Sequence, residues 1–192
     1  MNPIDQIIQF WKEAREKKDP ALDSMYLATV DAEGRPYVRT VLLKQVPDGR
    51  FGFVSRLGGK KHEHIAHKND VECCLHWSTL CLQVRLRCTT EKMDSASLGY
   101  FWQLRPREAQ IVYSMDFEQS QEIESFSLLE QLFKKAEKQF QKLKSIPLSK
   151  FYTGYFLKPY QIEFLWHQQS RLNRRELYKN EEGTWVCSTL TP

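Results

Sequence analysis

The sequence lacks the features that would mark a membrane, secreted or disulfide-bonded protein. No apolar run approaches the length of a membrane-spanning helix, so we expect no membrane association. The N-terminus reads Met-Asn-Pro-Ile-Asp, without the basic and then apolar layout of a signal peptide, which favours a cytoplasmic location. The five cysteines include no C-x-x-C pair. We therefore expect reduced thiols, and small buried side chains at Cys73, Cys74, Cys81 and Cys88.

A dense basic surface is also missing. The formal net charge is +4 and the pI is near 8.7. This balance suits an anionic small molecule better than a nucleic-acid duplex, so we expect no nucleic-acid partner. The 192 residues contain no internal repeat and no composition shift that would mark a boundary. The length predicts one domain over residues 1–192 with one sizeable core.

The stretch from Met25 to Lys44 predicts a β-hairpin. Two runs of strand-forming residues flank the turn sequence Asp31-Ala-Glu-Gly34. Along the second run, alternation puts Arg39 on one otherwise apolar face and Lys44 on the other. A cation on a largely buried strand is costly unless an anion meets it. Two interpretations stay open at this point: an anionic ligand, or ion pairs with carboxylates elsewhere in the fold.

Short strands and helices alternate through the rest of the chain. The fold class this predicts is mainly β with helical insertions, in which seven or eight antiparallel strands form a barrel-like core. The patterns predict an N-terminal helix at 3–17, capped by Asn2, and a helical insertion at about 127–144 that opens on a capping box at Ser127-Leu-Leu-Glu130. Two further helices are predicted at 60–68 and 95–104. The predicted strands after the first hairpin lie at 50–55, at 71–77 and 80–90, which form a second hairpin, and at about 160–188.

Three basic segments are candidate anion sites. Leu57-Gly-Gly-Lys-Lys61 leaves a strand and enters a helix, where backbone N–H groups and positive charge can bind phosphate. Arg105-Pro-Arg107 follows a helix, and Arg171 to Arg175 carries three arginines. Each segment is also compatible with an ordinary solvated loop. The histidines at 62, 64 and 67 lack the spacing of a zinc helix, so we expect a polar helix face and no metal.

The hairpin carries a pattern, A-T-V-D-x-x-G-x-P-x-x-R-x-V-L-L-K, that resembles the FMN-binding strand of the pyridoxamine 5'-phosphate oxidase family. The resemblance runs from about Pro3 to Pro192. It implies an FMN-binding split β-barrel, antiparallel and of Greek-key type, that forms a homodimer with FMN at the subunit interface. The matched positions imply these cofactor-binding residues: Arg39, Thr40, Val41, Leu42, Leu43, Lys44, Val54, Ser55, Lys60, Lys61, Gln83, Gln119, Ser120, Leu165 and Arg175.

The substrate side matches the family less closely. Phe101 stands where the family has tyrosine, with Tyr100 beside it, and Ala109 stands where it has serine. Asn173 replaces a histidine, and asparagine cannot carry a proton at neutral pH. The sequence begins at the first helix, so the resemblance implies a substrate pocket without the family's basic N-terminal segment. The implied substrate-binding residues are Lys44, Tyr100, Phe101, Arg105, Ala109, Arg171, Leu172 and Asn173.

The resemblance implies FMN-dependent oxidation of pyridoxamine or pyridoxine 5'-phosphate to pyridoxal 5'-phosphate, with dioxygen as acceptor. Arg171 and Asn173 are the implied catalytic residues, because Arg171 would lie over the substrate ring. Two alternatives stay open. The departures on the substrate side are compatible with a flavoprotein of the same fold that acts on another small molecule. They are also compatible with a non-catalytic binder of a flavin or a B6 phosphate.

Overall fold

A computed structural model describes residues 2–192, which form one eight-stranded antiparallel sheet and five α-helices. The strands are β1 (Ser24–Val30), β2 (Pro36–Gln45), β3 (Phe51–Arg56), β4 (Asp70–Trp77), β5 (Leu82–Lys92), β6 (Tyr152–Trp166), β7 (Arg174–Glu181) and β8 (Thr184–Leu190). The helices are α1 (Pro3–Glu16), α2 (Lys60–His67), α3 (Ser95–Gln103), α4 (Arg107–Ser114) and α5 (Phe126–Phe140), with a short 3-10 turn, η1, at Ser78–Leu80.

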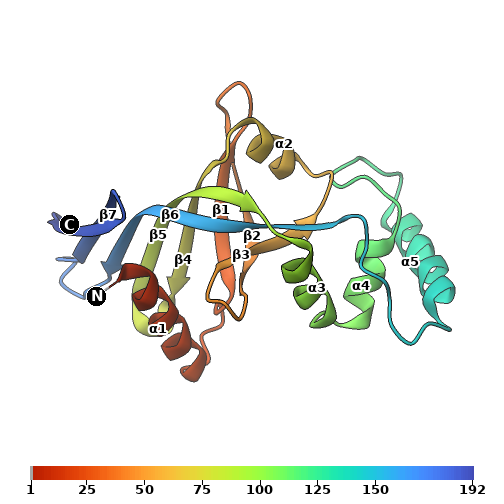
Figure 1. Ribbon diagram of the computed structural model, residues 1–192, viewed down its shortest axis with the longest axis horizontal. Helices are drawn as coiled ribbons and strands as arrows, with labels where there is room; N and C mark the ends of the chain where they lie inside the picture. Colours follow the sequence, from red (N-terminus) through yellow and green to blue (C-terminus); the bar gives the residue numbers. More distant parts are fainter. Residues whose placement is uncertain (1) are drawn as a thin grey trace.

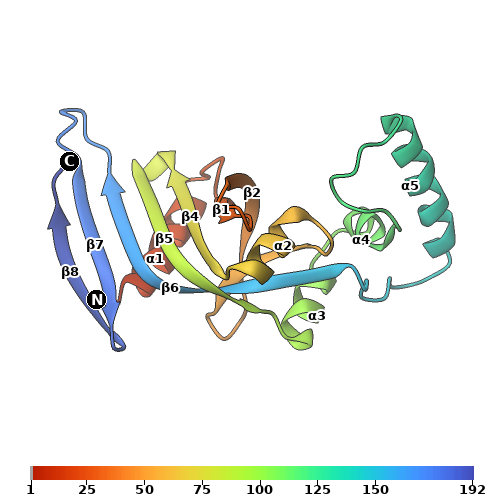
Figure 2. The ribbon, with the colours of Figure 1, turned by 90° about the horizontal axis from the view of Figure 1, so that it is seen from above.

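The sheet closes into the expected barrel. Its strand order is β3-β2-β1-β4-β5-β6-β7-β8, and β3 also pairs with β6, which closes a barrel of six strands. Strand β4 returns beside β1 after the β1–β2–β3 meander, and this return is a Greek-key connection. The β7–β8 hairpin extends the sheet at one end of the molecule, and α3, α4 and α5 gather at the other (Figures 1 and 2). The fold class predicted from the sequence is confirmed.

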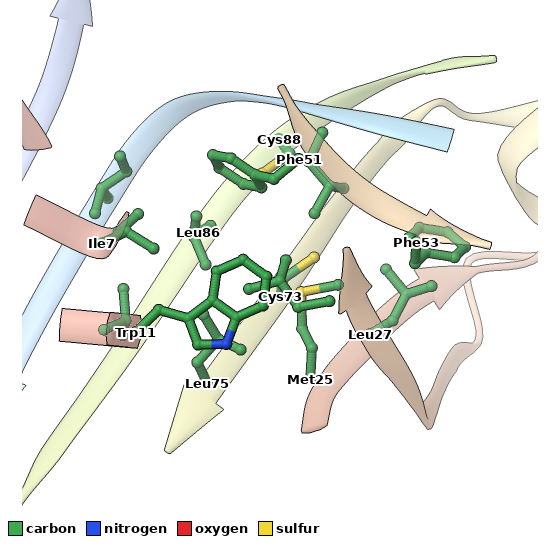
Figure 3. Packing of buried hydrophobic residues seen from close by; sticks show 14 of the residues in the cluster. Ile7, Trp11, Met25, Leu27, Phe51, Phe53, Cys73, Leu75, Leu86 and Cys88 are labelled. Atoms are coloured by element: carbon green, nitrogen blue, oxygen red, sulfur yellow. The ribbon is translucent and has the colours of Figure 1, made fainter. Parts of the chain in front are cut away.

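The main core fills the barrel and continues to the face of α1 that packs against the sheet. Alternate residues of β4 and β5 point inward, and α1 adds Ile7 and Trp11 from one face (Figure 3). Ala14 is buried on the same face of α1. Helix α1 begins as predicted, because Asn2 Oδ1 accepts a hydrogen bond from the N–H of Ile4 at 3.0 Å. A second apolar cluster joins α3, α4 and α5 to the open end of the barrel. The two clusters hold both ends of the long strand β6.

Helix α5 differs from its prediction at both ends. It runs over Phe126–Phe140, with Ser125 at the N-cap position and no side-chain cap, so the capping box predicted at Ser127 is wrong. The helix stops four residues before the predicted end at 144. There, the guanidinium of Arg107 donates to the carbonyl oxygens of Phe140 (2.6 Å) and Leu143 (3.0 Å). A side chain from another helix therefore satisfies carbonyl groups that a longer helix would have paired.

Two parts of the structure were not predicted from the sequence, the first half of β6 and the whole of α4. Strand β6 starts at Tyr152, eight residues before the predicted start at Tyr160, and it contains Gly154 and Pro159. Pro159 lies beside the register shift between Arg87 and Cys88, where a missing N–H is tolerated. A Cβ at Gly154 would lie 2.8 Å from a backbone oxygen of β3. Helix α4 was also missed, because Pro106 ends one helix and immediately precedes the next.

The histidines of α2 and one cysteine also differ from expectation. His62 and His64 are buried, so the predicted polar helix face is wrong for both, and only His67 is exposed. Each buried ring has a hydrogen-bond partner on a barrel strand, which explains its position. Cys73 and Cys88 are buried as expected and Cys74 is half-buried, whereas Cys81 is exposed at a left-handed turn after η1.

The burial of His62 predicts a loss of stability in mild acid. Its Nε2–H donates to the carbonyl oxygen of Arg56 at 2.6 Å, so Nδ1 accepts from the hydroxyl of Tyr155 at 3.0 Å. Burial, with the Lys61 charge nearby, lowers the pKa of His62 from 6.5 to about 4. The unfolded chain therefore takes up a proton that the fold excludes, and stability falls as the pH drops between these two values.

Urea unfolding at a pH of about 7 and again at about 4.5 measures this loss. In His62→Gln the part of the loss that comes from this residue should disappear, so its pH dependence should be shallower than that of the wild type. His67→Gln, on the exposed end of the same helix, is the control and should follow the wild type. Equal pH dependence in all three proteins would contradict the assignment.

Candidate functional site

The first of two adjoining clefts has a volume of about 500 Å³ and lies among β2, β3, α2 and the segment after α4. Arg39 reaches it from β2, Lys61 from the first turn of α2, and Gln119 from the segment after α4. The ammonium of Lys61 donates to Oε1 of Gln119 at 3.2 Å. Six further residues of the predicted cofactor set line the same cleft: Thr40, Val41, Leu42, Lys44, Val54 and Ser55.

Two of the cations that line this cleft, Arg39 and Lys61, are half-buried and lack a carboxylate partner within the described residues. Among residues 2–192, the ion pairs include neither Arg39 nor Lys61. Burial lowers the pKa of Arg39, and burial together with the nearby Arg39 charge lowers the pKa of Lys61. Two desolvated like charges side by side are unfavourable until an anion binds between them. The cleft has the electrostatics of an anion site.

The backbone at the start of α2 is also suited to binding an anion. Gly59 is the N-cap residue, it is buried, and it makes no side-chain cap. A Cβ at this position would lie 2.5 Å from Oε1 of Gln119 and 3.3 Å from Nζ of Lys61, so a larger residue here would displace the ends of these two cleft side chains. The N-terminus of a helix favours negative charge through its free N–H groups and its dipole.

The second cleft has a volume of about 550 Å³ and shares part of its wall with the first. Arg105 lies on the shared wall, with its guanidinium 4.4 Å from the ring of Tyr113 and 5.4 Å from that of Tyr152. Nε of Arg105 and the hydroxyl of Tyr152 are buried without a hydrogen-bond partner. Burial raises the pKa of Tyr152 to about 12, so it is a neutral donor. Of the predicted set, this cleft brings together Leu42, Leu43, Lys44, Val54, Phe101, Arg105 and Ala109.

Helix α1 and the link to β1 complete the second cleft. Trp11 lines it, and its indole N–H donates to Oδ1 of Asp23 at 3.1 Å. The other carboxylate oxygen of Asp23 lies 3.9 Å from the ammonium of Lys44. Lys44 therefore already has an anionic neighbour. Arg105, on the wall that the two clefts share, has a donor nitrogen, Nε, without a hydrogen-bond partner.

Other predicted residues lie outside both clefts. Gln83, Leu165 and Arg175 are side by side on β5, β6 and β7, because Gln83 pairs with Leu165 and Leu165 with Arg175. The β6–β7 connection lies at the end of the molecule opposite α3, α4 and α5 (Figure 1). That connection carries three more of the predicted residues, Arg171, Leu172 and Asn173.

These six residues, Gln83, Leu165, Arg171, Leu172, Asn173 and Arg175, form a distal group in which Arg175 and Asn173 have partners of their own. Arg175 pairs with the buried carboxylate of Glu163 at 2.7 Å, and Asn173 Oδ1 accepts from the N–H of Gln168 at 3.0 Å. Arg171 is exposed with a φ of 59°. Within a single chain, the predicted site residues therefore lie in separate places, most of them at the two clefts and the others in the distal group.

Three residues of the predicted set contribute to neither the clefts nor the distal group. Lys60 is exposed, with its ammonium 5.9 Å from the ring of Tyr37. Ser120 is exposed at a φ of 70° beside Gln119. Tyr100 is 40% exposed and packs edge-on against Phe101, which does line the second cleft.

Two family models match the chain. Residues 10–140 match a family described as pyridoxamine 5'-phosphate oxidase, and residues 152–192 match one described as the pyridoxine 5'-phosphate oxidase C-terminal dimerisation region. The chain belongs to the pyridoxamine 5'-phosphate oxidase family. It is therefore an oxidoreductase of this family, and the second match supports a homodimer.

Curated members of the oxidase family align over the whole chain. It is 33% identical over 191 residues to a pyridoxine/pyridoxamine 5'-phosphate oxidase of Vibrio cholerae, covering 100% of this chain and 90% of that one. It is 34% identical over 194 residues to the enzyme of the same name from Vibrio vulnificus, with the same coverage.

Solved structures show the same fold at lower identity. PhzG from Burkholderia lata, in complex with tetrahydrophenazine-1-carboxylic acid, superposes with a TM-score of 0.89 at 19% identity over 99% of this chain and 92% of that one. An FMN-binding protein related to pyridoxamine 5'-phosphate oxidase, from Nostoc punctiforme, gives 0.79 at 17% identity over 100% and 98%.

Arg56 is a residue of the first cleft that sequence reasoning missed. It lines the first cleft and is buried, and its two terminal nitrogens donate to four carbonyl oxygens of the segment that closes the cleft, those of Val112, Tyr113, Met115 and Phe117. Its guanidinium lies 4.0 Å from the ring of Phe117 and 4.4 Å from that of Phe151. No pattern in the sequence identifies it, because its partners are backbone groups of α4, which was not predicted, and of the segment that follows that helix.

Removing the Arg56 guanidinium should destabilise this oxidase-family chain strongly. Arg56→Met leaves the carbonyl oxygens of Met115 and Phe117 without their donor, whereas those of Val112 and Tyr113 keep a second donor. We expect a loss of about 3 kcal/mol in the free energy of unfolding. Urea unfolding measures it. Arg35→Met is the matched control, because Arg35 is exposed and pairs only locally with Asp31 and Glu33. That control should change stability by less than about 1 kcal/mol, and a similar small change in Arg56→Met would contradict the role.

Proposed function

We propose that this protein is an FMN-dependent oxidase that converts pyridoxine or pyridoxamine 5'-phosphate to pyridoxal 5'-phosphate, with dioxygen as acceptor. The observation that carries the proposal is the pair of half-buried cations, Arg39 and Lys61, which face one cleft without a carboxylate partner among residues 2–192. The cofactor phosphate is the anion we assign to them. Gly59 and the start of α2 fit a phosphate as well.

The second cleft is the proposed substrate site. Arg105 has an unsatisfied donor between two aromatic rings, so it can bind the substrate phosphate. Leu42, Val54 and Lys44 border both clefts, so a ring in one cleft lies next to a ring in the other. FMN, when bound, supplies the acceptor for the hydride that leaves the substrate carbon. The residues of this chain bind and orient the two molecules.

The separate positions of the two clefts and the distal group support a site built from two subunits. In the proposed homodimer, Gln83, Leu165 and Arg175 of the partner subunit complete the cofactor site, and the partner's Arg171 and Asn173 cover the substrate. The match to a dimerisation region over residues 152–192 includes most of that group. Asparagine at 173 can orient the substrate through hydrogen bonds but cannot accept a proton from it.

The proposed location is the cytoplasm. Among residues 2–192, no helix combines the length and the apolar content needed to cross a membrane.

A visible absorption spectrum tests the oxidase proposal. The FMN-reconstituted protein is mixed anaerobically with pyridoxine or pyridoxamine 5'-phosphate. We expect the flavin band to bleach and to return when air is admitted, with formation of pyridoxal 5'-phosphate. A flavin band that both compounds leave unchanged would reject these substrates. The absence of any bound flavin after reconstitution would reject the cofactor.

A second candidate substrate class is a planar aromatic carboxylate. The observation that favours it is the weakened phosphate site: Phe101 and Ala109 carry no hydroxyl, and Lys44 lies 3.9 Å from the carboxylate of Asp23. One free guanidinium between aromatic rings suits a singly charged planar acid better than a doubly charged phosphate. Bleaching of the flavin band by tetrahydrophenazine-1-carboxylic acid, with no response to the B6 phosphates, would favour this candidate.

A further inference from the structure

Thr29 and His64 form a buried hydrogen-bonded connection behind the first cleft. Both side chains are buried, one on β1 and the other on α2, and neither lines that cleft. Thr29 Oγ1 lies 2.9 Å from Nδ1 of His64 and accepts a hydrogen bond from Nη1 of Arg39 at 2.7 Å. The three residues thus connect the helix that carries Lys61 to the strand that carries Arg39.

The guanidinium of Arg39 is held from one side only. Nη1 donates to Thr29 and to the carbonyl oxygens of Leu27 (3.1 Å) and Tyr37 (3.3 Å). Nε and Nη2 make no hydrogen bond to any of residues 2–192. Arg39 also lines the cleft, so its two remaining donor nitrogens are available to an anion there.

We propose that His64 and Thr29 are positioning residues for the phosphate-binding cations, an inference that rests on the proposed FMN site. An arginine only donates, so Thr29 accepts from Arg39, and the hydroxyl proton of Thr29 is directed at Nδ1 of His64. His64 then carries its own proton on Nε2. This arrangement fixes both the rotamer of Thr29 and the orientation of the Arg39 guanidinium.

The connection also sets the distance between the two cations. Lys61 and His64 are three residues apart on α2 and so are neighbours on its surface. The ring of His64 packs against Tyr37 of β2, with 4.6 Å between centroids. Without an anion, Arg39 and Lys61 repel each other, and the Arg39 charge contributes to the lowered pKa of Lys61. A helix fixed to the β1–β2 hairpin resists that repulsion, so the phosphate meets cations that are already in place.

The test compares FMN with riboflavin, which lacks the phosphate. Titration of each flavin into the flavin-free protein, followed by fluorescence quenching, gives two dissociation constants per variant. We expect Thr29→Val and His64→Phe each to weaken FMN binding about tenfold and to leave riboflavin binding unchanged. Thr29→Ser keeps the hydroxyl and should restore FMN affinity. His67→Phe, an exposed position on the same helix, is the matched control and should bind both flavins as the wild type does.

The outcomes separate this inference from the proposed function. An equal loss of FMN and riboflavin affinity in Thr29→Val and His64→Phe would mean a general structural role and would overturn the inference. Unchanged FMN affinity in both variants would overturn it as well. If the wild type binds FMN no better than riboflavin, the assignment of a phosphate to Arg39 and Lys61 is itself wrong.

Discussion

Replacing Lys61 with methionine should weaken FMN binding roughly 10- to 100-fold, because a charge-assisted hydrogen bond to the phosphate is lost. The same change should stabilise the flavin-free protein. Lys61 is half-buried, its pKa is lowered by burial and by Arg39, and it has no carboxylate partner among residues 2–192. Methionine keeps most of the side-chain volume and removes an unpaired charge. Function and stability should therefore change in opposite directions.

Two measurements check this expectation. Fluorescence titration gives the FMN affinity, and urea unfolding of the flavin-free protein gives the stability. Lys68→Met, at the exposed end of α2, is the control and should alter neither quantity. A Lys61→Met protein that binds FMN normally would show that the phosphate does not lie against Lys61. A less stable flavin-free variant would show that the charge is compensated in the fold.

Replacing Arg171 should reduce turnover about 100-fold or more, since loss of substrate orientation has effects of this size. FMN should remain bound, because Arg171 is assigned to the substrate rather than to the cofactor and lines neither cleft of its own chain. Arg171→Asn is the variant of choice, because Arg171 has a φ of 59° and asparagine tolerates the left-handed region. Steady-state kinetics together with the flavin absorption measures both effects. Loss of flavin along with activity would indicate a folding defect instead.

Mixed dimers provide the sharper form of this prediction. If Arg171 acts on the cleft of the partner subunit, a dimer of one Lys61→Met chain and one Arg171→Asn chain has one intact site and one doubly damaged site. Such a dimer, purified through two different tags, should regain about half of the wild-type activity, although each parent dimer is nearly inactive. A mixed dimer as inactive as its parents would contradict the two-subunit site.

The strands were predicted well where alternation was regular and the turn residues were clear. The β1–β2 hairpin follows this rule, since Gly34 has a φ of 78° and Asp31 accepts hydrogen bonds from two N–H groups of the turn. Local signals failed at Pro159 and Pro106, because a proline reads as a break even where a bulge or a new helix follows.

Residues whose partners are distant in sequence were beyond prediction. The histidines of α2 have a polar composition, yet two of them are buried by Thr29, Arg56 and Tyr155, which lie on three different strands. Arg56 reads as a charged residue at a strand end, and its role comes from carbonyl groups more than fifty positions away. Asp23 reads as part of a polar link, although it lies against Trp11 and Lys44 at the second cleft.

By itself, the sequence determined the fold class, the family resemblance and the cations expected to meet an anion, because these depend on periodicity and on residue types in a fixed order. Only the tertiary structure decided which of these residues meet. Closure of β3 onto β6 brings Arg39, Lys61 and Arg105 to two adjoining clefts. The β6–β7 connection and β7 instead carry Arg171 and Arg175 at the other end of the molecule. The physical reason is that a binding site is made by pairing and packing between segments distant in sequence, whereas a pattern along the chain specifies only neighbours.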